Sequence, residues 1–283
     1  MDNHRPMDTE KAFAEVMKNI SEGRNAMVPP TVLEIAQSDS DPMTRIKCMS
    51  LLKVINDSEA SKTILGMLIE DLPDDPESCI QIAGAIRSLG YPSNAITILK
   101  GIPQEDRTVR LRVLCLMDLE EYESALEEES KIVDVLPFDR INLCEINSAL
   151  GQHDEAVSIA EALLSEYPKN YQVRKAYVSS LILGGREKEA AKYARAGIKD
   201  KTADSNAIAA YVLRIAANYK SAAGFATRAI TIDNGHIDAM ETLGICLAHK
   251  GEYDKARIIA GAINEKSPGD KAALNVLSYC EGH

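Results

Sequence analysis

Histidine, cysteine and carboxylate side chains that could bind a metal ion are scattered through this sequence. No two of its five histidines lie four residues apart, the spacing that places two ligands on one face of a helix. Asp233, His236 and Asp238 could meet in one loop, but the Asn-Gly pair after Asp233 is ordinary turn chemistry. Cys280 and His283 lie near the end of the sequence, where residues usually fray. We therefore expect no metal site and no cofactor.

The sequence also lacks the motifs that carry common catalytic chemistry. It has no Gly-rich phosphate loop after a strand and no Gly-x-Ser-x-Gly turn, and the pair Gly184-Gly185 fits the end of a helix. Its six cysteines are far apart and mostly lie in apolar helical runs, which favours buried free thiols over disulfides. An enzyme with its site in the N-terminal helices would need a cleft with convergent polar groups. Those helices show only ordinary amphipathic stripes, so we expect a non-enzymatic protein.

The overall charge narrows the classes of partner. The chain has 283 residues, a formal net charge of -11 and an isoelectric point near 5.1. This balance repels nucleic-acid phosphates and anionic lipid headgroups, so we expect neither general nucleic-acid binding nor membrane binding. The first residues lack the apolar core of a signal peptide, and no apolar run approaches the roughly 20 residues that span a bilayer. The expected location is the cytoplasm.

Glutamates are densest between residues 120 and 129. Glutamate is a good helix former, so the run is typical of the solvated outer face of a helix. The alternative is an acidic strip that docks a basic segment of a partner. The sequence favours the solvated face.

A short phrase that ends in alanine recurs six times and indicates how these residues are positioned. Successive final alanines are separated by 30 to 34 residues. The phrases begin at Gly90, Glu120, Gly151, Gly185, Ala217 and Gly251 and end at Ala95, Ala125, Ala156, Ala190, Ala222 and Ala256. A period near 34 with a small residue at each phrase end is typical of a stacked helix-turn-helix array. Such arrays usually bind other proteins.

The clearest repeat runs from Ile237 to Pro268. Its first helix carries Leu243 and Leu247 on one stripe, Gly251 ends that helix, and a Ser-Pro pair stops the second. This repeat resembles the tetratricopeptide repeat family. The matching hallmark positions are occupied by Leu243, Gly244, Leu247, Gly251, Tyr253, Ala256, Ala260 and Pro268. The resemblance implies an all-α solenoid of stacked helical pairs in a right-handed superhelix, with Gly244 and Ala256 where the two helices of a pair cross.

Some repeats depart from the family pattern. The aromatic residue usual at the fourth position is missing, and Arg140, Arg174 and Asn206 stand there in three central repeats. Glu129 replaces a small residue in an earlier repeat. We expect a helical region in residues 1–75 whose pairs continue the stack as degenerate repeats or as pairs like those of HEAT or tetratricopeptide repeats. Six repeats are expected in 76–268, and a capping helix and tail in 269–283.

The pattern predicts the positions of the helices. The first helices of the repeats are expected near 77–89, 106–118, 138–150, 171–183, 204–216 and 238–250. The second helices are expected near 93–101, 121–134, 153–166, 187–200, 219–231 and 253–266. A final helix near 270–280 would cover the open edge of the last repeat, since terminal repeats need a cap.

In tetratricopeptide repeat proteins the first helices line an inner groove that takes a peptide or helix from a partner. The resemblance points positions 2, 5, 9 and 12 of each first helix into this groove. The candidate partner-binding residues there are Arg107, Arg110, Lys175, Tyr211 and Arg214. Basic and aromatic side chains in an acidic protein suggest an acidic partner segment. The alternative is that they balance neighbouring acids on a wet surface.

The family's clamp for a C-terminal carboxylate is incomplete here. Lys175 is in place, but Ser179 stands where asparagine is needed, and Leu114 follows Arg110. We therefore expect a protein-interaction adaptor or scaffold without chaperone-tail binding. An RNA-binding repeat protein and a permanent subunit of a larger complex are the alternatives, and the sequence leaves the oligomeric state open.

Overall fold

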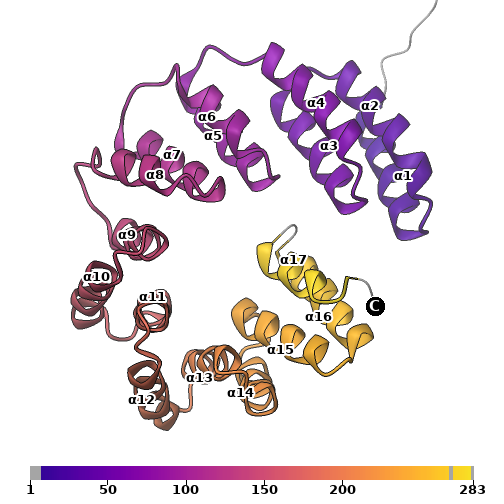
Figure 1. Cartoon of the computed structure of the whole chain (residues 1–283). Coiled ribbons are helices and arrows are strands. Elements are labelled where there is room, and N and C mark those ends of the chain that lie inside the picture. The colour runs from indigo at the N-terminus through magenta and orange to yellow at the C-terminus, as the bar shows by residue number, and fades with distance from the viewer. Residues whose placement is uncertain (1–7, 268–269, 282–283) are drawn as a thin grey trace, which may run out of the picture. The chain divides into compact units, whose positions relative to one another are not determined.

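The computed structural model describes residues 8–267 and 270–281, and the described residues form α-helices and short 3₁₀ segments without a strand. Contacts between Cα atoms divide the chain into two compact units, residues 1–132 and residues 133–283. Figure 1 shows that helices adjacent in sequence pair with one another along each unit. Each unit is a solenoid of stacked helical pairs, as expected. The right-handed superhelix concerns the whole chain and stays a prediction.

The N-terminal unit contains eight described helices. They are α1 (Thr9–Ser21), α2 (Val28–Ser38), α3 (Pro42–Val54), α4 (Ser58–Glu70), α5 (Pro76–Ser88), α6 (Pro92–Leu99), α7 (Asp106–Asp118) and α8 (Tyr122–Glu129). Asp41 and Asp75 cap α3 and α5 with their carboxylates, and each is followed by a proline at the first helical position. Local sequence therefore fixes where these helices begin.

The C-terminal unit contains the remaining described helices. They are α9 (Pro137–Ala149), α10 (His153–Glu166), α11 (Tyr171–Leu183), α12 (Glu187–Gly197), α13 (Ala203–Ile215), α14 (Tyr219–Ile232), α15 (Ile237–His249), α16 (Tyr253–Lys266) and α17 (Lys271–Ser278). A 3₁₀ turn, η2 (Ile198–Asp200), extends α12. The predicted helices are confirmed with boundaries that differ by at most two residues, apart from α8 and from α12, which was expected to reach residue 200 and ends at Gly197.

Helix α8 differs most, since it was expected to reach residue 134 and ends at Glu129. The hydroxyl of Ser130 donates to the carbonyl of Glu127 over 2.7 Å, and two 3₁₀-type bonds follow it. Serine competes with the backbone for hydrogen bonds in this way, which ends a helix early. Pro268, expected to stop α16, lies outside the described residues.

The first residue of every repeated phrase has positive φ. Four of the six are glycines, and the other two are Glu120 with φ 60° and Ala217 with φ 55°. A left-handed residue after a helix lets the chain reverse and satisfies the last carbonyls of that helix. The phrase is therefore the turn between the two helices of a pair.

The same turn occurs between α3 and α4, where the sequence shows no such phrase. Asn56 has φ 57°, and the amide of Asp57 donates to the carbonyl of Leu52 over 2.9 Å. The amide of Tyr91 bonds to Ile86 in the corresponding way between α5 and α6. Helices α3 and α4 therefore form a pair with the same connection as the repeats.

One apolar core runs from α1 to α7, from Phe13 to Cys115. The N-terminal helices and the first repeats share this core, so packing divides the chain near residue 132 and leaves no boundary at residue 75. The division into 1–75, 76–268 and 269–283 describes the repeat pattern and stays a prediction.

Small residues let the helices of the C-terminal unit approach closely. Ala256 and Ala260 are buried, as the repeat pattern requires. Gly244 was expected where α15 crosses α16, and that placement stays a prediction. A Cβ on Gly244 would lie only 2.7 Å from the methyl carbons Cγ1 and Cγ2 of Val276 in α17. Helix α17 thus caps the last repeat by packing on the first helix, α15, as well as on α16.

Candidate functional site

A hollow of about 760 Å³ crosses the first helices of the repeats in the C-terminal unit. It draws residues from α9, α11, α13, α15 and α17 and from the turns that begin the last two of these helices. The lining residues are Glu145, Tyr171, Gln172, Lys175, Asp204, Asp233, His236, Ile237, Asp238, Glu241, Asp270, Lys271, Ala272 and Asn275. The repeat stack therefore lines up the same end of successive first helices into one surface.

This hollow is acidic. Six of its lining side chains are carboxylates and two are lysines. The ammonium of Lys175 lies 2.7 Å from the carboxylate of Asp238, so the positive charge of Lys175 is neutralised inside the protein. An excess of carboxylates in a concave surface concentrates cations near it.

The ionised form of Asp238 is stabilised by its neighbours in the hollow. Burial opposes its ionisation, but the Lys175 ammonium and the hydrogen bonds from Lys175 and from the Tyr171 hydroxyl outweigh it and lower the pKa of Asp238. The same burial, together with the neighbouring carboxylates, raises the pKa of Tyr171. Asp238 is therefore a fixed negative charge at neutral pH.

His236 lies between α13 and α15 and contacts both helices. It caps α15 by accepting the amide of Ala239 at Nδ1 over 3.4 Å, and its ring packs edge-on against Tyr171 with centroids 4.7 Å apart. Its Nε2 lies 3.6 Å from the carboxylate of Asp204. The turn that the sequence presented as ordinary turn chemistry thus also places the His236 ring beside Tyr171 and Asp204 in the hollow.

A second, smaller hollow of about 320 Å³ lies beside the first on α9, α11 and α13. Lys175 and Gln172 line both hollows, and Tyr211 and Ser179 line the smaller one, where the Ser179 hydroxyl donates to the Tyr211 hydroxyl over 3.3 Å. Cys144 also lines it, and burial raises the pKa of its thiol to about 11. That thiol stays protonated at neutral pH and is a poor nucleophile.

The five candidate groove residues are divided between the two units. Lys175 and Tyr211 line the smaller hollow together, and the Arg214 guanidinium lies 5.4 Å from the Tyr211 ring. Arg107 and Arg110 belong to the N-terminal unit, where Arg107 binds Glu77 over 2.6 Å and Arg110 lies 3.9 Å from its neighbour Asp106. The role of all five residues in partner binding stays a prediction.

Sequence reasoning missed the acidic lining. It selected basic residues at positions 2, 5, 9 and 12 of the first helices. The same positions hold Asp204, Asp238 and Glu241 in α13 and α15, and all three line the larger hollow. The positions that point into the groove would therefore have been enough to predict these carboxylates.

Among the described residues, no group of three or more His, Cys, Asp and Glu side chains is arranged to hold a metal ion. His283 lies outside the described residues. No helix in residues 8–267 or 270–281 combines the length and apolar character needed to cross a bilayer. All six cysteines are buried and free, which confirms the expected thiols.

The glutamate run between residues 120 and 129 is mostly exposed, as a solvated face requires. Glu120, Glu121, Glu123 and Glu127 are exposed, whereas Glu129 is buried at the position that usually takes a small residue. The solvated-face interpretation therefore holds for most of the run.

Family models match two segments of the chain. Models described as "Tetratricopeptide repeat" match residues 145–170 and 213–278. A tetratricopeptide repeat protein from Parabacteroides merdae is similar in structure, with a TM-score of 0.53 at 13% identity over 84% of this chain and 98% of the other. Yeast Tom70 is similar with a TM-score of 0.53 at 14% identity, over 99% of this chain and 64% of the other.

These structural similarities establish the fold. They do not establish a function, because the sequence identities are too low. No curated protein shows significant sequence similarity to the chain. The matched segments contain α10, α14, α15, α16 and α17, and their turns are the ones built on the recurring phrase. Residues 145–170 and 213–278 therefore match the tetratricopeptide repeat, and the chain has the fold of tetratricopeptide repeat proteins.

Proposed function

We propose that this protein is a non-enzymatic interaction scaffold whose C-terminal unit binds a basic segment of another protein. The segment lies across α11, α13, α15 and α17, in the hollow of about 760 Å³. Tetratricopeptide repeat proteins are generally interaction scaffolds, which supports the general role. The observation that supports the proposal most directly is the lining of six carboxylates against two lysines.

The proposed partner charge is opposite to the one expected from the sequence. Lys175 was a reason to expect an acidic partner, but its charge is neutralised by Asp238. Glu241 and Asp204 are half-buried in the hollow, and Glu241 accepts one hydrogen bond from Asn275 over 2.8 Å. Lysine or arginine side chains of a partner would complement these carboxylates with charge-assisted hydrogen bonds.

The test is binding of a fluorescein-labelled peptide of alternating lysine and alanine, measured by fluorescence anisotropy. Neutralising the hollow with Glu145→Gln, Asp204→Asn and Glu241→Gln should weaken binding about tenfold or more, because complementary charges at a docking surface are lost. The peptide with glutamate in place of lysine serves as the charge-reversed probe.

A matched control removes the same number of charges elsewhere. Asp154, Glu155 and Glu187 are exposed on the second helices α10 and α12. The variant Asp154→Asn, Glu155→Gln, Glu187→Gln should bind the basic peptide nearly as well as the wild type. Equal weakening by both variants would show that only net charge matters and would contradict a docking site in the hollow.

The same assay addresses the alternative of RNA binding. A single-stranded RNA oligonucleotide should not bind, since the carboxylates of the hollow repel phosphates. Tight RNA binding that falls steeply with salt would overturn the proposal.

A further inference from the structure

Three arginines are almost fully buried among the described residues. Arg45, Arg112 and Arg174 expose 5%, 8% and 7% of their surface. A buried guanidinium is costly unless anions or carbonyl oxygens replace the water that it loses. The partners of each guanidinium therefore show whether its charge is compensated inside the protein.

Arg45 and Arg112 are compensated by their own chain. Arg45 donates to two backbone carbonyls near the ends of α2 and α4 and to the carboxylate of Asp71 over 2.8 Å. Arg112 donates to two carbonyls at and just beyond the end of α6 and lies 3.8 Å from the carboxylate of Glu128. Both arginines thus use carbonyl oxygens and an acid.

Arg174 has neither kind of partner. Its Nε donates to the hydroxyl of Tyr193 over 3.3 Å, and its Nη2 donates to the hydroxyl of Ser205 over 3.1 Å. Within the described part of the chain no carboxylate lies within ion-pair distance of it and no group accepts a hydrogen bond from Nη1. Two hydroxyls are weak compensation for a buried positive charge, so this guanidinium retains unused donors.

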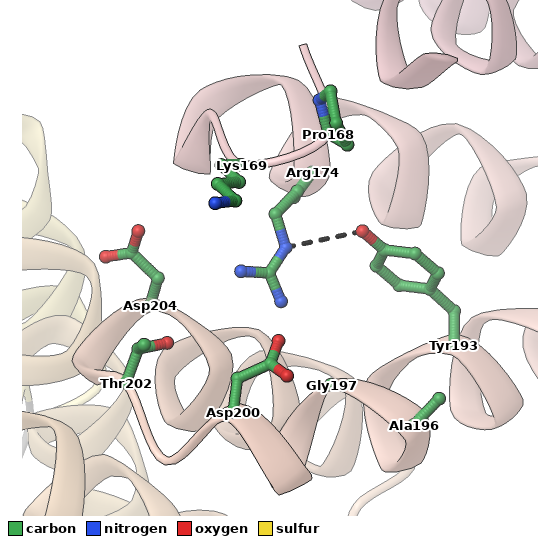
Figure 2. Close-up of a pocket in the computed structure, with 9 residues that line it drawn as sticks. All are labelled: Pro168, Lys169, Arg174, Tyr193, Ala196, Gly197, Asp200, Thr202 and Asp204. Atoms are coloured by element: carbon green, nitrogen blue, oxygen red, sulfur yellow. Dashed lines mark hydrogen bonds between the residues drawn. The ribbon is translucent and has the colours of Figure 1, made fainter.

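These donors face a pocket of about 500 Å³ between the turn before α11 and the end of α12. Figure 2 shows the Arg174 guanidinium in the middle of this pocket, with Lys169 and Asp204 on one side and Tyr193 on the other. A Cβ at Gly197 would lie 3.0 Å from Nη2, so the glycine keeps this space open. The pocket lies at the turns between repeats, and Asp204 is its one residue in common with the acidic hollow.

We propose that this pocket binds a carboxylate side chain of a peptide that also carries a basic residue beside it. The fork of N–H groups on an arginine matches the two oxygens of a carboxylate, and the Lys169 ammonium adds a second positive charge. Asp200 and Asp204 also line the pocket and would receive the basic neighbour. The same two carboxylates disfavour phosphate, because a dianion would meet two like charges.

This site shares only Asp204 with the acidic hollow, and it rests on Arg174 and not on the carboxylates of α15 and α17. It also gives a reason for the unusual residue at the fourth position of α11. Arg140 at the same position of α9 is partly exposed and paired with Glu166 over 2.8 Å, so it offers no such pocket.

The test is a nuclear magnetic resonance titration that follows the side-chain Nε–H signal of Arg174. The probe is N-acetyl-aspartyl-lysine amide, and its neutral counterpart is N-acetyl-asparaginyl-lysine amide. We expect a saturable shift with the aspartyl probe, with a dissociation constant on the order of 1 mM. Inorganic phosphate and the asparaginyl probe should bind at least about tenfold more weakly.

Variants of the pocket residues test whether the shift of the Arg174 signal comes from binding in this pocket. Arg174→Gln should weaken binding about tenfold or more, as followed through the backbone signals of Lys169 and Gly197. Gly197→Ala should also weaken it, because the added methyl crowds Nη2. Gly224→Ala is the control, since Gly224 is an exposed helical glycine with nothing within 4 Å of its Cβ position. Should Arg174→Gln fail to fold, Gly197→Ala and Lys169→Gln carry the test.

Several outcomes would overturn the proposal. One is the absence of any saturable shift at Arg174 with the aspartyl probe. Another is an equal response to the asparaginyl probe or a stronger response to phosphate. A third is unchanged binding in both Gly197→Ala and Lys169→Gln.

Discussion

Replacing Gly244 with alanine tests how closely α17 is packed on α15. The new Cβ would lie 2.7 Å from both methyl carbons of Val276, whereas carbon atoms in contact prefer about 3.5–4.0 Å. Val276 is fully buried and β-branched, so in a helix it has little freedom to change rotamer. The helices must therefore separate by about 1 Å, and overpacking of this kind costs about 1–3 kcal/mol.

Helix propensity acts in the opposite direction and must be removed from the comparison. Alanine is better than glycine inside a helix by about 1 kcal/mol. Gly261 in α16 provides the control, because nothing lies within 4 Å of its Cβ position and it is exposed. We expect Gly261→Ala to stabilise the protein and Gly244→Ala to be less stable than Gly261→Ala by about 1–3 kcal/mol.

The assay is chemical denaturation followed by far-ultraviolet circular dichroism, together with hydrogen exchange of the α17 backbone. Stacked repeats can unfold one after another, and a terminal helix can loosen before the rest. Adding Val276→Ala should relieve the clash, so the double variant should lose less stability than the two single variants combined. Equal stability of Gly244→Ala and Gly261→Ala, with unchanged exchange in α17, would refute the packing of Gly244 on Val276.

Three further predictions concern a helix crossing, a turn and an ion pair. Ala256→Leu should cost about 1–3 kcal/mol in a thermal melt because Ala256 is fully buried, and no loss would contradict its place in the core. Ala217→Gly should raise the free energy of unfolding by about 0.5–1 kcal/mol in urea, since Ala217 has φ 55° and glycine adopts positive φ without strain; a less stable variant would argue against this turn. Asp238→Asn should cost about 1 kcal/mol at pH 7 by removing the pair with Lys175. Because folding lowers the pKa of Asp238, its ionised form contributes stability above the unfolded pKa of about 3.8. That contribution is lost as the pH falls through the folded pKa, so urea denaturation should give a stability difference that disappears in acid and not in alkali.

Local chemistry in the sequence was sufficient to predict most of the fold. The glycine that begins a phrase, the alanine that ends it and the apolar spacing between them act within one helical pair. The Asp-Pro starts of α3 and α5 are equally local. Ser130 shows the limit of such patterns, because a single hydroxyl bonded to a carbonyl ended α8 earlier than the apolar pattern predicted.

The candidate site was only partly predictable because its character depends on residues far apart in the sequence. Lys175 was recognised as a groove residue, but its neutralisation by Asp238 joins α11 to α15 across 63 residues. Whether two such side chains meet depends on the stacking of whole repeats and cannot be inferred from either repeat alone. Position in the repeat therefore identified the surface but gave the wrong weight to its charges.

The sequence by itself determined that this protein is a stack of helical pairs, since propensity, capping and turn conformation depend on neighbouring residues. Tertiary structure alone decided which charged side chains are neutralised inside the protein and which can still bind another molecule. Arg45, Arg112 and Arg174 are all buried, yet only Arg174 was left without an acid or a carbonyl and beside an open pocket. The physical reason is that the cost of burying a charge depends on every group that packing brings around it, including groups from other repeats.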